Sequence, residues 1–222
     1  MATEDQRRTG ERMIARFSLA ERWAHRCLAT LVMILLVTAA LLYIPDLAAV
    51  VGRRQLVRVV HEIAGFTLPI PIILALGSRA FRADIRRLNR FTPADWTWLR
   101  SRSRRLGIVD VGKFNAGQKL NAAFSLGAII VMLVTGSMMF FSSAFDDLLR
   151  TGATFVHDWL ALAVLVVVVG HISMAYRDAS ARLGIRTGEV PLTWAFREHR
   201  QWAQEQTQQS ARPHDGDPAD PS

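Results

Sequence analysis

The sequence predicts an all-α integral membrane protein, a bundle of four transmembrane helices. Half of its 222 residues are hydrophobic, and they gather in four blocks instead of recurring at the periods of a soluble helix or strand. The blocks cover residues 23–44, 59–77, 120–141 and 155–176. Each has about 20 residues, which is enough for a helix to cross a hydrocarbon core of roughly 30 Å. The placement of Lys and Arg then gives these spans a direction.

The four blocks differ in how cleanly they predict a span. The first has no charged residue from Cys27 to Ile44, and we expect it to be an uncleaved first span and not a signal peptide. The third and fourth are nearly as free of charge. The second is the shortest and carries Glu62 near its start, with Pro69 and Pro71 inside it. Because proline lacks a backbone N–H and clashes with the preceding turn, these prolines predict a kink in the second helix.

The net charge of +8 comes from basic residues that cluster between alternate spans. If both termini and the loop between the second and third spans lie inside, 23 of the 27 Lys and Arg residues are inside and 4 are outside. This positive-inside bias predicts a multi-pass protein of the bacterial cytoplasmic (inner) membrane with both termini in the cytoplasm. The basic residues therefore predict contact with anionic membrane lipid and not with nucleic acid.

The segments outside the spans divide the chain into three parts. Residues 1–14 are polar and predict a flexible N-terminus. Residues 15–204 hold the four spans and their loops, which we expect to form one membrane domain. Residues 205–222 are polar and contain several Asp and Pro residues, so they predict a disordered C-terminal tail.

Two amphipathic segments within the membrane domain predict short helices at the membrane surface. In the inner loop, Thr92 is a candidate helix cap and Pro93 a first-turn residue, with Trp96 and Trp98 placed to lie at the level of the lipid headgroups. The second segment, Pro191–Gln204, follows the fourth span. Its large aromatic residues among charged neighbours are Trp194, Phe196 and Trp202.

The histidines carry the chemical information in this sequence. The six are His25, His61, His157, His171, His199 and His214. We expect the last two at the surface, one in the amphipathic segment and one in the tail. The first four lie in or at the ends of spans one, two and four, where ionisable residues are costly and usually functional. A single histidine at a span boundary is more often hydrogen-bonded to backbone or a lipid headgroup. Only the geometry of the four histidines together indicates ligands of a metal centre.

The spacing and direction of the spans sort these histidines into two pairs. His157 and His171 are 14 residues apart on one helix, which places them within roughly 40° of the same face and roughly 21 Å apart along the axis. The predicted topology puts His61 at the outer level with His157, and His25 at the inner level with His171. Two imidazoles on opposing helices form a bis-histidine haem site, so the sequence predicts two b-type haems in the bundle.

Two other uses of the histidines compete with haem. Zinc prefers a cluster of four ligands, and only two histidines are expected at each level. A proton relay would recruit Asp or Glu at intermediate depth, and spans one, three and four have none there. The single Cys27 excludes an internal disulfide or an iron–sulfur cluster held by this chain alone. Since no Cys-x-x-Cys-His motif occurs, the haems would be bound non-covalently.

From about Arg16 to Trp202 the chain resembles the cytochrome b (gamma) subunit of respiratory membrane-bound formate dehydrogenases. It also resembles, more broadly, the four-helix cytochrome b subunits of nickel–iron hydrogenases. The marks of the resemblance are Arg16-Phe17, Glu21-Arg22, His25, His61 with Gly65, the segment Asp110–Lys119, His157, His171 and Met174-Ala175-Tyr176. The stretch GKFNAGQK, which leads into the third span, is the part of that segment typical of the formate dehydrogenase branch.

This resemblance implies roles for individual residues. His61 and His157 would hold an outer haem, and His25 and His171 an inner haem, which agrees with the pairing derived from the topology. Near His171, the residues implied to line a quinone site are Asn115, Gly117 and Gln118. The side-chain amides of Asn115 and Gln118 suit this role because they can hydrogen-bond a quinone oxygen. Without the resemblance, the segment would predict only the start of a helix with interfacial lysines. The chain departs from the family pattern at Glu62, where proline is expected.

The resemblance also implies a function. The chain would anchor an iron–sulfur (beta) subunit and a catalytic molybdenum or tungsten (alpha) subunit of formate dehydrogenase at the outer face. It would pass their electrons through the outer and inner haems to menaquinone or ubiquinone, with no formate chemistry of its own. The alternatives are a cytochrome b subunit of a hydrogenase or a related oxidoreductase and, more distantly, a membrane anchor without haem.

Overall fold

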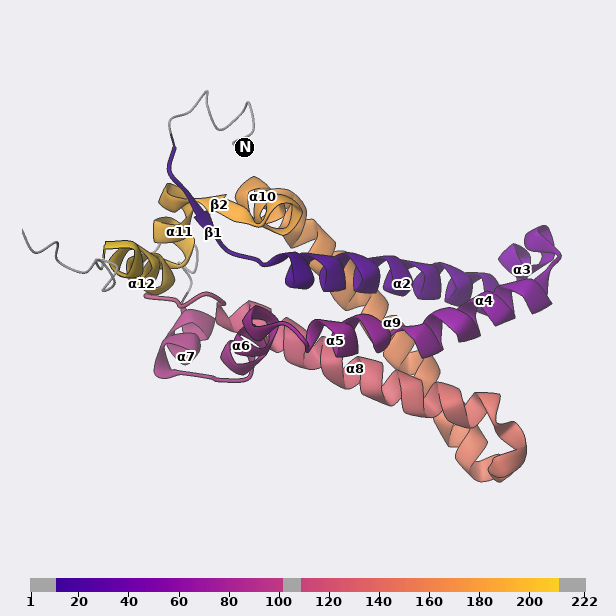
Figure 1. Cartoon of the computed structure of the whole chain (residues 1–222). Helices are drawn as coiled ribbons and strands as arrows, with labels where there is room; N and C mark the ends of the chain where they lie inside the picture. Colours follow the sequence, from indigo (N-terminus) through magenta and orange to yellow (C-terminus); the bar gives the residue numbers. More distant parts are fainter. Residues whose placement is uncertain (1–10, 102–108, 212–222) are drawn as a thin grey trace, which may run out of the picture.

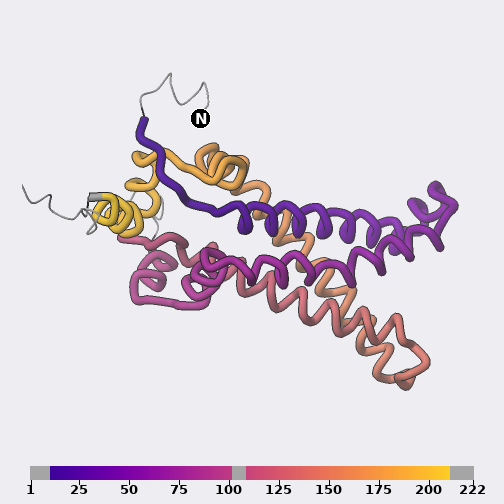
Figure 2. Tube along the Cα trace, in the orientation of Figure 1, coloured from indigo at the N-terminus to yellow at the C-terminus, as the bar shows by residue number. Residues whose placement is uncertain are grey.

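The computed structural model describes residues 11–101 and 109–211, and four long helical units dominate it (Figures 1 and 2). These are α2 (Leu19–Tyr43), α4 with α5 (Arg54–Thr67 and Ile70–Ala75), α8 (Ala116–Phe140) and α9 (Asp147–Arg177). All four are long and apolar enough to cross a membrane. They overlap the four predicted blocks, so the prediction of a mostly helical chain with four candidate spans is confirmed.

Local sequence sets where these helices begin and end. Ser18 caps α2 through a capping box with Glu21, and Asp146 caps α9 by accepting from the Leu149 backbone N–H. After the C-terminal end of α2, the short helix α3 (Pro45–Val51) starts at a proline. It is capped by Gly52, whose φ of 64° suits glycine. The chain thus turns sharply between the first two spans.

The second span is broken, as its prolines predict. Helix α4 ends at Thr67 and α5 begins at Ile70, with Leu68 and Pro69 between them. Pro69 has no N–H to continue the ladder of hydrogen bonds, and the Leu68 N–H bonds to the Gly65 carbonyl, three residues back, instead of the carbonyl four residues back.

The spans pack as two helical hairpins. Helix α2 lies along α4 and α5, α8 lies along α9, and α4 also contacts α8. Apart from Val57 and Leu68, the uncharged residues buried in the spans are small, as is usual where membrane helices approach closely: Ala24, Thr38, Ala64, Ala75, Ala116, Ala128, Thr135 and Ala153. Large apolar side chains such as Val37, Val134 and Val166 point outward. A lipid-facing surface has this composition.

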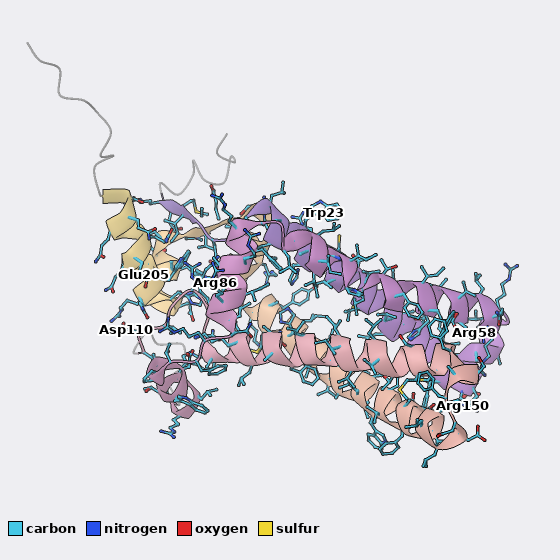
Figure 3. All side chains as sticks on the ribbon, turned by 60° about the horizontal axis from the view of Figure 1, so that its bottom comes forward. Trp23, Arg58, Arg86, Asp110, Arg150 and Glu205 are labelled. Atoms are coloured by element: carbon cyan, nitrogen blue, oxygen red, sulfur yellow. The ribbon has the colours of Figure 1, made fainter. Side chains whose placement is uncertain are left out.

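Apart from η1 (Ser142–Ala144), a short 3-10 helix between α8 and α9, the remaining described elements gather at one end of the bundle. They are β1 (Met13–Ala15), α6 (Arg79–Leu88), α7 (Pro93–Arg100), α10 (Ala179–Thr187), β2 (Glu189–Pro191), α11 (Leu192–Glu198) and α12 (Arg200–Ala211). Strands β1 and β2 pair antiparallel, with Ile14 opposite Val190, so the two terminal segments lie side by side. Figure 3 shows Arg86, Asp110 and Glu205 at this end and Arg58 and Arg150 at the opposite end.

The terminal segments differ from the sequence prediction. Met13 and Ile14, expected in a flexible N-terminus, belong to β1; residues 1–10 of that segment lie outside the described residues. Helix α12 continues to Ala211, although a disordered tail was expected from residue 205; residues 212–222 of the tail lie outside the described part. Pairing with β2 stabilises the N-terminal segment, and packing against the protein stabilises α12, although both segments are mostly polar.

Both predicted amphipathic helices form, but they pack on the protein. Helix α7 has the predicted cap at Thr92 and Pro93 in its first turn, and Trp96 is exposed, whereas Trp98 is buried. The predicted helix Pro191–Gln204 is two helices, α11 and α12, with a break at His199. Trp194 and Trp202 join Val190, Ala195 and Ala203 in a buried cluster instead of facing lipid.

Candidate functional site

Four histidines meet as two pairs inside the bundle. The ring centroids of His61, on α4, and His157, on α9, are 6.4 Å apart. Those of His25, on α2, and His171, on α9, are 6.3 Å apart. The structure therefore brings together the two pairs that spacing and span direction predicted.

Threonines on neighbouring helices orient His61 and His157, called the outer pair after the level predicted for them. The Thr38 hydroxyl donates to the Ile34 carbonyl at 2.7 Å, and its oxygen is 2.8 Å from His61 Nδ1. Since the one hydroxyl proton is already used, the oxygen accepts from the imidazole, so Nδ1 carries the ring proton. His61 Nε2 then keeps a lone pair. This protonation state suits a metal ligand whose second nitrogen is held by a hydrogen bond.

His157 repeats this arrangement with a different helix. The Thr135 hydroxyl on α8 donates to the Val131 carbonyl at 2.8 Å and accepts from His157 Nδ1 at 2.9 Å. The ring also lies close to the α8 backbone, because a Cβ added at Gly136 would be 3.4 Å from His157 Cε1. Sequence reasoning missed both threonines. The available signal was a threonine at the depth of each outer histidine, on an adjacent span.

His25 and His171, called the inner pair after the level predicted for them, are less constrained. Neither His25 nor His171 makes a side-chain hydrogen bond within the part of the chain that the structure describes, and both residues are exposed. The two levels therefore share their ring separation but differ in what surrounds the imidazoles.

The geometry of both pairs fits a bis-histidine iron. Two metal–nitrogen bonds of about 2 Å, with roughly 1 Å from each nitrogen to its ring centre, place two coordinating imidazoles roughly 6 Å apart. Both measured separations match this value. Among the described residues, no three His, Cys, Asp or Glu side chains converge to hold a metal ion. The pairs therefore suit a group that itself fills the other four positions around iron, as a haem macrocycle does, better than they suit zinc.

The segment before α8 places the predicted quinone residues at a helix start. Asn115 is the N-cap of α8: its side-chain oxygen accepts from the Gln118 N–H at 2.9 Å, and the Gln118 side-chain oxygen accepts from the Asn115 N–H at 3.0 Å. This capping box occupies both amide oxygens and leaves both amide nitrogens as donors. Gly117 is covered by Trp98, because a Cβ there would be 3.1 Å from the Trp98 ring.

Two buried lysines hold this segment against α6 and α7. Lys113 pairs with Asp84 and lies 3.6 Å from a Glu21 carboxylate oxygen, and Lys119 donates to Asp95 at 2.6 Å. Burial alone would raise the pKa of the Asp95 carboxyl, but the hydrogen bonds from Lys119 and Thr92 lower it below its usual range. Without the family resemblance, the segment would predict interfacial lysines. They are partners in buried ion pairs instead.

A small pocket of about 130 Å³ opens beside these ion pairs. It is lined by Arg87, Arg90, Thr92, Lys113, Phe114 and Lys119. Asp84 and Asp95 neutralise part of this basic lining.

The structure corrects the expected placement of His199. This residue was expected at the surface, yet it is 1% exposed, and its ring lies between the Gly112 carbonyl and the Arg16 guanidinium. The amphipathic pattern of α11 and α12 predicts an apolar face but not what covers it. In the structure this face packs on the protein and not on lipid. His214 lies outside the described residues.

Comparison with known proteins agrees with this geometry. The family model of prokaryotic cytochrome b561 matches residues 16–182, which include all four paired histidines. The chain belongs to the prokaryotic cytochrome b561 family. Membership implies that it binds haem b, and the four apolar helices agree with a multi-pass membrane cytochrome.

Curated relatives of this cytochrome b561 chain are formate dehydrogenase subunits. It is 26% identical to the formate dehydrogenase cytochrome b556 subunit of Haemophilus influenzae, over 87% of this chain and 83% of the relative. It is 24% identical to the cytochrome b556(fdo) subunit of Escherichia coli, over 86% and 92%. The nitrate-inducible cytochrome b556(Fdn) subunit of E. coli is 29% identical over 44% and 46%.

Proposed function

We propose that this chain is the di-haem cytochrome b subunit of a membrane-bound formate dehydrogenase. Two histidine pairs at two depths of one bundle support this proposal, because each has the separation of a bis-histidine site. The bound haems would supply one-electron transfer between an iron–sulfur partner outside and a quinone inside. His61 and His157 would hold the outer haem, and His25 and His171 the inner haem.

The chain's own residues would bind and orient. Thr38 and Thr135 keep the Nδ1 nitrogens protonated, so that the lone pairs on Nε2 are available to iron. At the inner end, the amide nitrogens of Asn115 and Gln118, which make no hydrogen bond within the described residues, would donate to the oxygens of menaquinone or ubiquinone. Reduction of the quinone would take protons from the cytoplasmic side.

The partners would be an iron–sulfur subunit and a molybdenum- or tungsten-containing catalytic subunit. The relatives named above, which are cytochrome subunits of formate dehydrogenases, support this assignment over a hydrogenase. Co-purification from membranes, followed by subunit identification, tests it directly. Recovery with a hydrogenase instead of a formate dehydrogenase would contradict the assignment while leaving the haem sites standing.

Replacing one histidine of each pair tests the haem sites. We expect His171→Met to remove mainly the inner haem and abolish quinone reduction, because one of its two ligands is changed. His157→Ala should remove mainly the outer haem. The measurements are the reduced α-band of the purified complex, the haem-to-protein ratio and quinone reduction by formate. Wild-type protein without a b-type spectrum, or His171→Met protein that keeps both haems, would contradict the proposal.

A further inference from the structure

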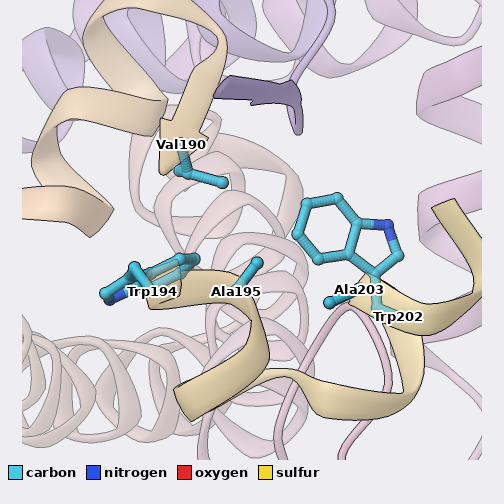
Figure 4. Packing of buried hydrophobic residues seen from close by; sticks show 5 residues of the cluster. All are labelled: Val190, Trp194, Ala195, Trp202 and Ala203. Atoms are coloured by element: carbon cyan, nitrogen blue, oxygen red, sulfur yellow. The ribbon is translucent and has the colours of Figure 1, made fainter. Parts of the chain in front are cut away.

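A buried arginine joins the N-terminal segment to the C-terminal helices. Arg16 lies between β1 and α2 and is 4% exposed. Its guanidinium carbon is 4.9 Å from the Trp194 ring centroid and 5.1 Å from that of Trp202. Figure 4 shows these two tryptophans in the cluster that α11 and α12 form with β2. Burial lowers the pKa of Arg16 to about 10, so the side chain is still a cation at neutral pH.

His199 completes this contact in one defined protonation state. Its Nε2 is 3.1 Å from Arg16 Nη2, and since arginine only donates, Nε2 accepts. Nδ1 therefore carries the proton, which it donates to the Gly112 carbonyl at 2.8 Å. Burial and the adjacent Arg16 charge lower the pKa of His199 to about 3, so the ring is neutral.

Arg16 and His199 hold two consecutive carbonyls of the segment that leads into α8. Arg16 Nη2 also donates to the Lys113 carbonyl at 2.8 Å, next to the Gly112 carbonyl held by His199. Two residues later comes Asn115, the cap of α8 and one of the candidate quinone donors. Residues from opposite ends of the chain therefore fix the backbone just before these donors.

We propose that Arg16 and His199 are positioning residues for quinone reduction. They hold the Gly112–Lys113 backbone so that the amide nitrogens of Asn115 and Gln118 face the quinone. This inference rests on the proposed function and adds to it two residues that touch neither haem nor quinone. His199 lies beyond residues 16–182, the part that matches the family model.

Two substitutions of His199 separate its two hydrogen bonds. An asparagine amide nitrogen lies near the position of Nδ1, so His199→Asn keeps the donor to Gly112 and loses the acceptor for Arg16. A glutamine amide reaches the position of Nε2, so His199→Gln keeps the acceptor and loses the donor to Gly112. Both remove the ring that packs against Trp194, which makes them matched controls for each other.

The experiment uses the intact complex in membranes with formate and a soluble quinone. We expect His199→Gln to raise the KM for quinone about 10-fold, because the Gly112 carbonyl loses a buried hydrogen bond. His199→Asn should stay within about 2-fold of wild type, because the Gly112 carbonyl keeps its donor and Arg16 still donates to the Lys113 carbonyl. Arg197→Gln, which changes an exposed side chain on α11, should behave as wild type. Formate-reduced haem spectra should be unchanged in all three variants. Equal KM values for the two His199 variants would overturn the inference.

Hydrogen–deuterium exchange of residues 111–119 provides a readout that needs no quinone. His199→Gln should speed exchange in this segment and His199→Asn should not. If wild-type complex fails to reduce quinone, the proposed function fails, whereas the two variants still test the backbone contact. Equal exchange in both variants would overturn the contact itself.

Discussion

At the residue scale, two threonine hydroxyls decide which nitrogen of each outer histidine is protonated. Thr38 and Thr135 each donate their proton to a carbonyl of their own helix and can then only accept from imidazole. Such second partners keep a ligand in one orientation, and their loss typically weakens metal affinity 10–100-fold. No equivalent hydrogen bond holds His25 or His171 within the described residues.

We therefore expect the threonines to affect one haem level only. Thr135→Val should weaken retention of the outer haem about 10-fold, because His157 Nδ1 loses its acceptor. Redox titration and the haem-to-protein ratio of the purified complex measure this loss. Thr67→Val is the matched control, since the Thr67 hydroxyl also donates to a carbonyl four residues earlier. Equal loss of both haems in Thr135→Val protein would contradict the expectation.

His199 shows why some residue roles could not be read from the sequence. Spacing within one helix predicted the histidine pairs, since a helix converts sequence separation into direction and height. The partners of His199 are Arg16 and Gly112, 183 and 87 residues away in the chain. Nothing local to α11 or α12 indicates that their apolar face packs on these residues.

At the scale of elements, caps and breaks were the most predictable features and buried ion pairs the least. The prolines of the second span and the cap of α7 at Thr92 act through their own backbone, so local sequence predicts them. The contact between α7 and α8 depends on Lys119 Nζ, which donates to Asp95 and to the Arg90 carbonyl. Lys119 and Asp95 belong to different elements, and only packing brings them together.

Breaking this ion pair should destabilise the inner end of the bundle. Asp95→Asn is expected to cost roughly 3–5 kcal/mol, because it leaves the Lys119 charge buried without its counter-ion. Thermal unfolding in detergent measures the change. The double variant Asp95→Asn with Lys119→Met should lose less than the sum of the single variants. Arg150→Ala is the control, because it removes only a surface pair with the 93% exposed Asp147 and should cost about 0–1 kcal/mol.

The same pair predicts a pH dependence. The pKa of Asp95 is lower in the folded chain than in the unfolded chain, so its contribution to stability is fully present above the unfolded value of about 3.9. It is lost as pH falls through the lowered folded pKa. Acid unfolding below about pH 4 should therefore be steeper for wild type than for Asp95→Asn.

At the scale of the whole molecule, the two ends of the described chain meet on one side. Strand β1 pairs with β2, which α10 and α11 contact, and α6, α7 and α12 lie at the same end of the bundle (Figure 1). Four spans bring the chain back to the side from which it started, and the basic residues predict that this side is the cytoplasm.

Cysteine labelling in intact cells tests this orientation. In a Cys27→Ser background, Ser143→Cys lies in the short helix after the third span and should react with an impermeant maleimide from outside. Gln208→Cys, on the exposed face of α12, should react only after the cells are lysed. The lysed sample shows that both cysteines are reactive. Labelling of Gln208→Cys in intact cells would reverse the proposed topology.

By itself, the sequence determined the number of spans, the break in the second span and which histidines face each other. These follow from properties that add up along a short stretch: hydrophobic transfer, backbone hydrogen bonding and helical periodicity. The tertiary structure alone decided which threonines fix the outer imidazoles and that His199 is buried. It also decided that Arg16 reaches the segment before α8. Such contacts join residues on separate elements, and their existence depends on how the helices pack.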